Sequence, residues 1–149
     1  MKRALTALTM LSLTAAAQPL NTQPILTAQA EVTVFLPYVK SYDVSEQLRK
    51  LALTGRRVVI ITTPASVTSP QSYILKLAHV PGVKTYVIRT NGTPFAIMDR
   101  RTAVAGEGLD IQGGRVQPVD VTGLNEWAAK VTRGTPFAPV DLLKMRYTK

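Results

Sequence analysis

A short, uninterrupted apolar run near the middle of the chain restricts the fold strongly. Val58 to Thr62 reads Val-Val-Ile-Ile-Thr, and none of these residues carries a charge. Such residues pack well on a pleated sheet, and a continuous apolar run without alternation is typical of a parallel strand whose two faces are both covered. The run therefore predicts a buried strand in the sheet of an α/β protein.

Patterns typical of strands and helices alternate on both sides of this run. Val32 to Leu36 and Val83 to Ile88 have the composition of further strands. Between the first of these and the central run, Asp43 and Glu46 have the spacing of a capping pair that opens a helix, and Gly55 is placed to end it. The alternation predicts a single mixed sheet flanked by helices.

The remaining elements are predicted from turn residues and helical spacing. Helices are expected to begin at Ser69-Pro70 and to span Gly123 to Val131. Asn91-Gly92 is expected to form a turn, and Phe95 to Met98 to pair with Thr102 to Ala105 as a hairpin. These elements complete an α/β domain without an internal repeat.

The first residues resemble an export signal. Lys2 and Arg3 precede an apolar segment from Ala4 to Ala17, which is shorter than the roughly 18 to 20 residues that a membrane-spanning helix needs. The small residues at its end predict cleavage after Ala17, with Ala28-Gln29-Ala30 as a later alternative. We therefore expect an exported protein, located in the periplasm, at the envelope or outside the cell.

The length of 149 residues suits one domain with a core. We expect residues 1–17 to be a signal peptide, and residues 18–30, which are rich in Pro, Gln and Thr, to be a flexible leader. Residues 31–134 are then the folded domain. Residues 135–149 contain prolines and basic side chains and are expected to form a C-terminal tail with a last turn of helix.

From Val32 to Leu109, the order of features resembles one half of a phospholipase D-like domain. The first strand ends in Leu36-Pro37-Tyr38, and a later helix leads through Pro81-Gly82-Val83 into a strand, as in that family. In the family, a hairpin then carries the signature H-x-K-x-x-x-x-D. Asp99 fits the last position of this signature, with apolar residues before it and Gly106 after it. The resemblance implies a phospholipase D-like half as the fold and phosphodiester hydrolysis as the family's chemistry.

The sequence departs from the signature where that chemistry resides. Counting back from Asp99, the family's histidine falls on Gly92 and its lysine on Pro94, and the Ser and Asn that follow fall near Glu107 and Leu109. In the family, the histidine attacks phosphorus and the lysine holds the phosphate charge. Glycine has no side chain and proline has no ammonium group, so neither position supports nucleophilic or acid–base catalysis. The resemblance thus implies a lost active site, and we assign no catalytic residue.

No other residues form a recognisable replacement for the missing groups. His79 is the single histidine, and near the end of a predicted helix it is expected to be a surface residue that the helix dipole favours. The chain has no cysteine, and its acidic residues show no spacing typical of a metal site. We predict neither a bound metal nor a cofactor.

Positive charge is the remaining indication of function. The chain has 18 Lys and Arg residues against 9 Asp and Glu, which gives a net charge of +9. Such a surface is able to hold a polyanion through phosphate contacts, although basic residues also serve as ordinary solvated surface. The candidates for anion binding near the lost site are Arg89, Asn91, Thr93, Arg100 and Arg101.

Three classes of function remain open. The first is an exported, non-catalytic domain that binds a polyanion, either nucleic acid or anionic lipid headgroups, or a protein partner. By analogy with family members that have one such half, it would pair as a homodimer or with an intact paralogue. The second is a phosphodiesterase whose chemistry has moved to Asp99, Glu107 or His79. The third is an envelope-associated structural protein that uses the C-terminal tail for docking.

Overall fold

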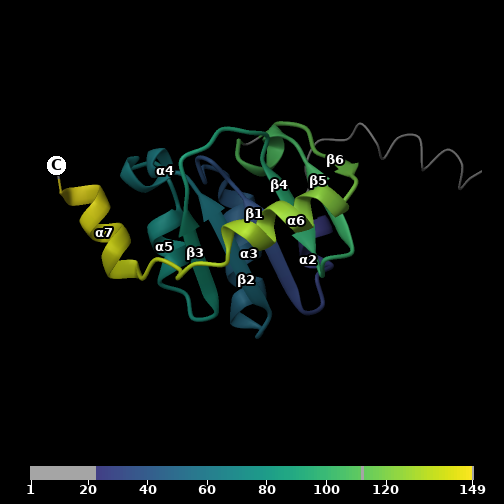
Figure 1. Ribbon diagram of the computed structural model, residues 1–149, viewed down its shortest axis with the longest axis horizontal. Coiled ribbons are helices and arrows are strands. Elements are labelled where there is room, and N and C mark those ends of the chain that lie inside the picture. Colours follow the sequence, from purple (N-terminus) through teal and green to yellow (C-terminus); the bar gives the residue numbers. More distant parts are fainter. Residues whose placement is uncertain (1–22, 112, 149) are drawn as a thin grey trace, which may run out of the picture.

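The computed structural model describes residues 23–111 and 113–148 (Figure 1). These residues form one six-stranded mixed sheet with the strand order β3-β2-β1-β4-β5-β6, flanked by helices. The predicted fold class, a single mixed sheet flanked by helices, is confirmed. The predicted signal peptide, residues 1–17, lies outside the described residues.

The sheet has a parallel half, made by β1 to β3, and an antiparallel half, made by β4 to β6. The strand bounds are Glu31–Phe35 (β1), Arg57–Thr62 (β2), Val83–Val87 (β3), Phe95–Met98 (β4), Thr102–Ala105 (β5) and Gln117–Val119 (β6). The predicted strands and the predicted hairpin are confirmed. The short strand β6 extends the hairpin on its outer side and was not predicted.

Helices cover the two faces of the sheet unequally. Each face of the sheet has its own hydrophobic core. The larger core, which contains Val34 and Ile60, receives side chains from α2, α3, α4, α5 and α7. The smaller core, which contains Phe35 and Ile61, receives them from α6, which crosses the front of the sheet in Figure 1. The helix bounds are Gln23–Leu26 (α2), Tyr42–Leu53 (α3), Pro64–Thr68 (α4), Ile74–Ala78 (α5), Thr122–Val131 (α6) and Pro139–Tyr147 (α7), with a 3-10 turn at Glu107–Leu109. Among the described residues, no helix is both long and apolar enough to cross a membrane.

Successive side chains of each strand point to opposite faces of the sheet and therefore enter the two cores alternately. Val34 and its neighbour Ile60 lie in the larger core, whereas Phe35 and its neighbour Ile61 lie in the smaller one. Val58 to Thr62 is therefore continuously apolar because both of its faces are covered, as the sequence predicts.

Residues 23–30 do not behave as a flexible leader. α2 begins at Gln23, and the side chains of Ile25 and Ala28 are completely buried in the larger core. The backbone N–H groups of Gln29 and Ala30 donate to the carboxylate of Asp99 at 2.8 Å each. The prediction is wrong for this segment because two apolar residues three positions apart are enough to bury one side of a helical turn.

The last turn of helix that the sequence predicts is present as α7, but it is packed on the fold and is not part of a tail. Within α7, Leu142 is completely buried in the larger core. Arg146 donates to the carbonyl oxygens of Val67 at 2.7 Å and Ser69 at 2.6 Å, and so fixes the helix to the end of α4. Pro139 is compatible with this helix because it stands in the first turn, where a backbone N–H has no helical partner.

Two local predictions also differ from the structure. No helix begins at Ser69-Pro70, because Pro64 takes the first position of α4 and the next helix, α5, begins only at Ile74. Asn91-Gly92 forms no tight turn, because it lies in the irregular connection of residues 88–94. That connection joins β3 to β4, which are not neighbours in the sheet, so a two-residue turn would be too short.

Candidate functional site

Gly92 and Pro94, where the sequence places the family's histidine and lysine, lie at the carboxyl ends of the parallel strands. The connection that contains them starts at edge strand β3 and must pass β2 and β1 to reach β4. Along this path the Ile88 N–H donates to the Thr62 carbonyl at 2.9 Å, and Gly92 lies beside the Phe35 ring. This edge of the sheet is where ligands bind in many open α/β folds.

Three aromatic rings pack together beneath Gly92. The ring centroids of Phe35, Phe95 and Trp127 are 5.4 to 5.8 Å apart in tilted or edge-to-face arrangements. A β-carbon added at Gly92 would lie 3.4 Å from Cε2 of Phe35. A side chain at position 92 would therefore extend over this cluster.

A groove of about 470 Å³ lies over the three rings, and we call it the aromatic groove. Its walls include Leu124 of α6, and its rim includes Asn91 and Asp120. The place that the signature gives to a nucleophilic histidine is thus an apolar depression, and Pro94 beside it is buried.

The structure separates the residues that the sequence groups as an anion site. Arg89, Asn91 and Thr93 precede β4, whereas Arg100 and Arg101 follow it together with Asp99. The N–H of Asp99 donates to the carbonyl of Glu31, the first residue of β1, while Gly92 lies beside the last residue of that strand. The two groups therefore lie at opposite ends of the sheet and cannot bind one small anion together.

Asp99 is committed to backbone hydrogen bonds. Its carboxylate accepts the N–H groups of Gln29, Ala30 and Glu31 at 2.8, 2.8 and 3.0 Å. These bonds, that from Gln29 most of all, hold the pKa of Asp99 below its ordinary value. Asp99 adopts a positive φ of 53°, which the hairpin turn requires. The residue anchors the start of β1 rather than facing the aromatic groove.

A second acidic residue supports the loop after β1. Asp110 is completely buried, and its carboxylate accepts the N–H groups of Tyr38 at 2.8 Å and Val39 at 2.6 Å. Burial raises the pKa of this carboxyl, although the same hydrogen bonds oppose the rise. Sequence analysis did not identify Asp110, because a single acidic residue in a Gly-rich stretch carries no pattern.

The segment before Asp110 is packed backbone against backbone. The signature's Gly106 adopts a φ of 150°, and a β-carbon there would collide with the carbonyl group of Arg115. Glu107, near the position of the family's serine, is exposed, and Leu109, near that of the asparagine, is completely buried. Leu109 therefore belongs to the core and offers no polar group to a ligand.

His79 and the acidic residues do not assemble a substitute active site. His79 is exposed at the end of α5, where its Nδ1 lies 2.7 Å from the carbonyl oxygen of Leu75. This is the surface position at a helix end that the sequence predicts. Across residues 23–111 and 113–148, no group of three or more potential ligands could hold a metal ion.

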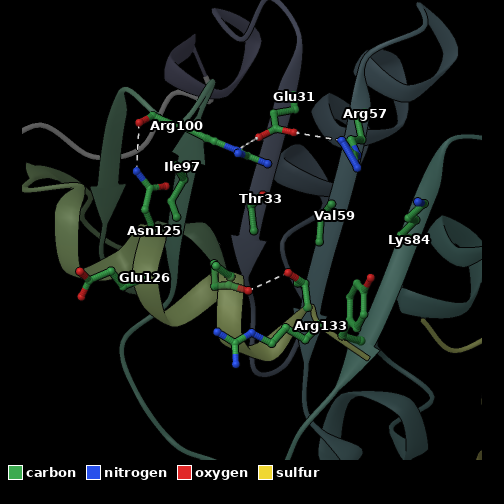
Figure 2. Close-up of a pocket in the computed structure, with 14 residues that line it drawn as sticks. Glu31, Thr33, Arg57, Val59, Lys84, Ile97, Arg100, Asn125, Glu126 and Arg133 are labelled. Atoms are coloured by element: carbon green, nitrogen blue, oxygen red, sulfur yellow. Dashed lines mark hydrogen bonds and ion pairs between the residues drawn. The ribbon is translucent and has the colours of Figure 1, made fainter. Parts of the chain in front are cut away.

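A second groove, which is lined by charged side chains and has a volume of about 540 Å³, lies on the face of the sheet that α6 covers. We call it the sheet-face groove. Its basic side chains come from β2, β3, the β4–β5 turn and the end of α6, and they are Arg57, Lys84, Arg100 and Arg133. Figure 2 shows Arg57 and Lys84 on neighbouring strands, with Arg133 across from them.

Glu31 partly neutralises one end of the sheet-face groove. It accepts from Nε of Arg100 at 2.7 Å and lies 3.6 Å from an Nη of Arg57 (Figure 2). The side chains of Lys84 and Arg133 form no hydrogen bond or ion pair within the described part of the chain. The floor of the groove includes Tyr86, two residues beyond Lys84 on the same face of β3.

Comparisons with known proteins identify the fold. No protein-family model matches the sequence, and no curated protein matches it significantly. Among solved structures, NucT from Helicobacter pylori superposes with a TM-score of 0.63 at 18% identity, over 76% of this chain and 86% of NucT. Nuc from Salmonella typhimurium, a phospholipase D family member, superposes with a TM-score of 0.57 at 15% identity, over the same 76% and 86%.

The chain has the phospholipase D-like fold. The resemblance seen in the sequence is therefore confirmed for the architecture. TrmBL2, an archaeal chromatin protein, is also similar, with a TM-score of 0.50 at 15% identity over 87% of this chain and 58% of TrmBL2. The assignment of the signature's histidine and lysine to Gly92 and Pro94 remains a prediction from spacing in the sequence.

Proposed function

We propose that this protein is a non-catalytic, phospholipase D-like domain that binds nucleic acid through the sheet-face groove. The observation that carries the proposal is the convergence of Arg57, Lys84, Arg100 and Arg133 on that groove. Arginine and lysine side chains bind phosphate oxygens, and release of counterions from the nucleic acid makes such binding favourable at low salt.

The proposed lack of catalysis rests on the lost signature positions. Gly92 has no group to attack phosphorus, and Pro94 has no ammonium to hold the charge of the phosphate. Asp99, the signature residue that remains, is occupied by the backbone of residues 29–31. None of these residues is therefore available for a phosphoryl-transfer step.

Lys84 and Arg133 are the side chains best suited to phosphate contacts. Both are exposed, and no acidic side chain of the described residues forms an ion pair with either. Binding a phosphate therefore breaks no existing ion pair at these two positions. Arg57 and Arg100 share Glu31, so their contribution to an incoming anion is smaller.

The form of the groove favours nucleic acid over anionic lipid headgroups. The basic side chains line a depression between α6 and β3, whereas a membrane surface is flat on this scale. Tyr86 adds a partly buried ring to the floor, and aromatic rings stack on bases irrespective of sequence. TrmBL2, the chromatin protein with a similar fold, binds DNA, which agrees with this choice.

The test compares two double variants with the same change in charge. Lys84→Gln with Arg133→Gln alters the sheet-face groove, whereas Lys76→Gln with Lys144→Gln alters α5 and α7, which contribute to the other core. We expect wild type and the second variant to bind a fluorescent oligonucleotide equally, and the first variant to bind at least about tenfold more weakly. Equal loss in both variants would contradict the proposal.

Two further measurements separate the alternative functions. Binding to vesicles of anionic phospholipid, without binding to oligonucleotide, would favour a headgroup partner. Turnover of bis-nitrophenyl phosphate would favour a phosphodiesterase with relocated residues. If the protein shows neither binding nor turnover and fractionates with the envelope, the result would favour a structural protein.

The proposal includes export and pairing. Export is supported by the basic and apolar character of residues 2–17. Pairing as a homodimer, or with an intact paralogue, follows by analogy with the family and would bring two grooves into one assembly. Cell fractionation and light scattering of the purified protein test these two points separately.

A further inference from the structure

The aromatic groove is a second concave site that the proposed polyanion binding does not use. It lies at the carboxyl ends of the parallel strands, beside Gly92 and Trp127, and it shares no lining residue with the sheet-face groove. Its floor is made of rings, and polar groups are confined to its rim. This composition is typical of sites for small organic groups.

Gly92 keeps the aromatic groove open. It has no positive φ that would demand glycine, and a β-carbon there would make only a van der Waals contact of 3.4 Å with Phe35. A larger side chain would therefore be tolerated by the backbone and would fill the space above the rings. Gly92, which has no nucleophilic side chain, thus also leaves room for a ligand.

The packing of the floor favours a planar ring as the occupant. Phe35, Phe95 and Trp127 meet in tilted or edge-to-face pairs, and a further ring placed above them would continue the same arrangement. Trp127 is only partly buried, so a portion of its ring is accessible from the groove. An aliphatic chain would bury area there without these ring contacts.

The charge of the rim decides which kind of ring would bind. The lining contains the carboxylate of Asp120 and the amide of Asn91 but no lysine or arginine. Within the described residues, neither of these side chains makes a hydrogen bond. The carboxylate would accept N–H groups at the edge of a ring and would repel a phosphate.

From these observations we propose that the aromatic groove binds a nucleobase-type heterocycle, a neutral planar ring that carries N–H donors at its edge. The ring would pack on Trp127 and the phenylalanines, with its donors directed to Asp120. This site is independent of the sheet-face groove, so base binding and phosphate binding can succeed or fail separately. The ring could be supplied as a free nucleoside or as an unstacked base of a bound strand.

Trp127 provides a direct readout because it is the only tryptophan of the chain. We expect adenosine to change its fluorescence saturably in the full-length protein, and ribose phosphate and hexanol to leave it unchanged. Gly92→Leu should weaken adenosine binding at least about tenfold by filling the groove, and Asp120→Ala should weaken it several-fold by removing the acceptor.

A matched glycine gives the control. Gly134 has open space around its β-carbon position and no positive φ, so Gly134→Leu makes the same chemical change away from the groove. This variant should bind adenosine as wild type does, and thermal unfolding should confirm that both variants fold. No response to adenosine would overturn the proposal, as would an equal response to hexanol or ribose phosphate, or equal binding by folded Gly92→Leu.

The source of the ring is distinguished with a short oligodeoxyadenylate. If the base arrives on a strand, the oligonucleotide should bind more tightly than adenosine, and only its binding should weaken in Lys84→Gln with Arg133→Gln. If the ligand is a free nucleoside, adenosine should bind at least as tightly as the oligonucleotide, in that variant as in wild type. Wild-type protein that binds adenosine but no oligonucleotide would contradict only the proposed function.

Discussion

Asp99 and Glu31 are joined by a reciprocal pair of hydrogen bonds. The N–H of Asp99 donates to the Glu31 carbonyl at 2.9 Å, and the Asp99 carboxylate accepts the Glu31 N–H at 3.0 Å. The same carboxylate accepts from Gln29 and Ala30, and these backbone bonds lower the pKa of Asp99 from its ordinary value of 3.8. Asp99, which the sequence assigns to the last position of the signature, therefore fixes the beginning of β1.

This arrangement predicts a dependence of stability on pH. Because the folded pKa of Asp99 lies below the unfolded one, its contribution is fully present above the unfolded pKa and is lost as the pH falls through the folded pKa. We expect Asp99→Asn to lower the urea midpoint at neutral pH and to approach wild type in acid. Asp120→Asn, an exposed control, should change the midpoint little at neutral pH. A deficit of Asp99→Asn that persists unchanged into acid would contradict the assignment.

The burial of Ile25 limits how many N-terminal residues can be removed without loss of stability. It is completely buried, whereas the adjacent Leu26 is 41% exposed. We expect Ile25→Ala to reduce the free energy of unfolding by about 2 to 4 kcal/mol, and Leu26→Ala by less than about 1 kcal/mol. A chain that starts at Glu31 should be destabilised further than Ile25→Ala, because it also lacks Gln29 and Ala30, two of the three residues that donate to Asp99. Equal stability of chains starting at residues 18 and 31 would contradict this role of α2.

The raised pKa of Asp110 predicts a pH dependence of folding stability opposite to that of Asp99. Burial raises its folded pKa above the unfolded value, so its contribution to stability increases as the pH falls from neutral toward the unfolded pKa. Asp110→Asn should cost about 1 to 3 kcal/mol, because an amide nitrogen cannot accept the N–H of Tyr38 or Val39. Urea unfolding should show the difference from wild type growing with acidification. A shrinking difference would mean that the carboxylate is stabilised in the fold.

The elements of the sheet could be predicted because their patterns are local. The apolar run at Val58 to Thr62 and the hairpin around Asp99 are visible within a few residues, and both are confirmed. α2 could not be predicted in this way, since its stability comes from the burial of Ile25 against distant parts of the chain. For α7 the sequence predicts a last turn of helix but not its packing, which depends on Leu142 and on the carbonyl groups that Arg146 reaches.

The sites were harder to predict than the fold, because proximity in sequence is not proximity in space. Thr93 and Arg100 are separated by a strand of four residues, which spans roughly 13 Å, so they lie at its two ends. Lys84 and Arg57, in contrast, are far apart in sequence and line one groove because β2 and β3 are neighbouring strands. Alternation within each strand indicates the shared face, but the register between strands is needed to bring these residues together.

The sheet-face groove predicts a specific dependence on salt. Each phosphate contact that is removed should reduce the slope of log K against log salt by about 0.7 to 0.9. Lys84→Gln with Arg133→Gln should therefore reduce the slope for an oligonucleotide by about 1.5. Anisotropy titrations over a range of salt concentrations measure this slope, and the double variant Lys76→Gln with Lys144→Gln is the control. Weaker binding at an unchanged slope would mean that the two residues stabilise the groove without contacting phosphate.

The proposed loss of the signature's histidine and lysine predicts that the protein does not hydrolyse bis-nitrophenyl phosphate. His79 offers no alternative nucleophile, because it is exposed at the end of α5 beside the Leu75 carbonyl, whereas Gly92 lies beyond β3. Gly92→His should also be inactive, since Pro94 still provides no cation for the phosphate. Release of nitrophenol measures the rate, and His79→Ala is the matched control for wild type. Turnover by wild type that His79→Ala abolishes would show that the chemistry has moved to His79, and turnover that survives this change would point to Glu107 or Asp99.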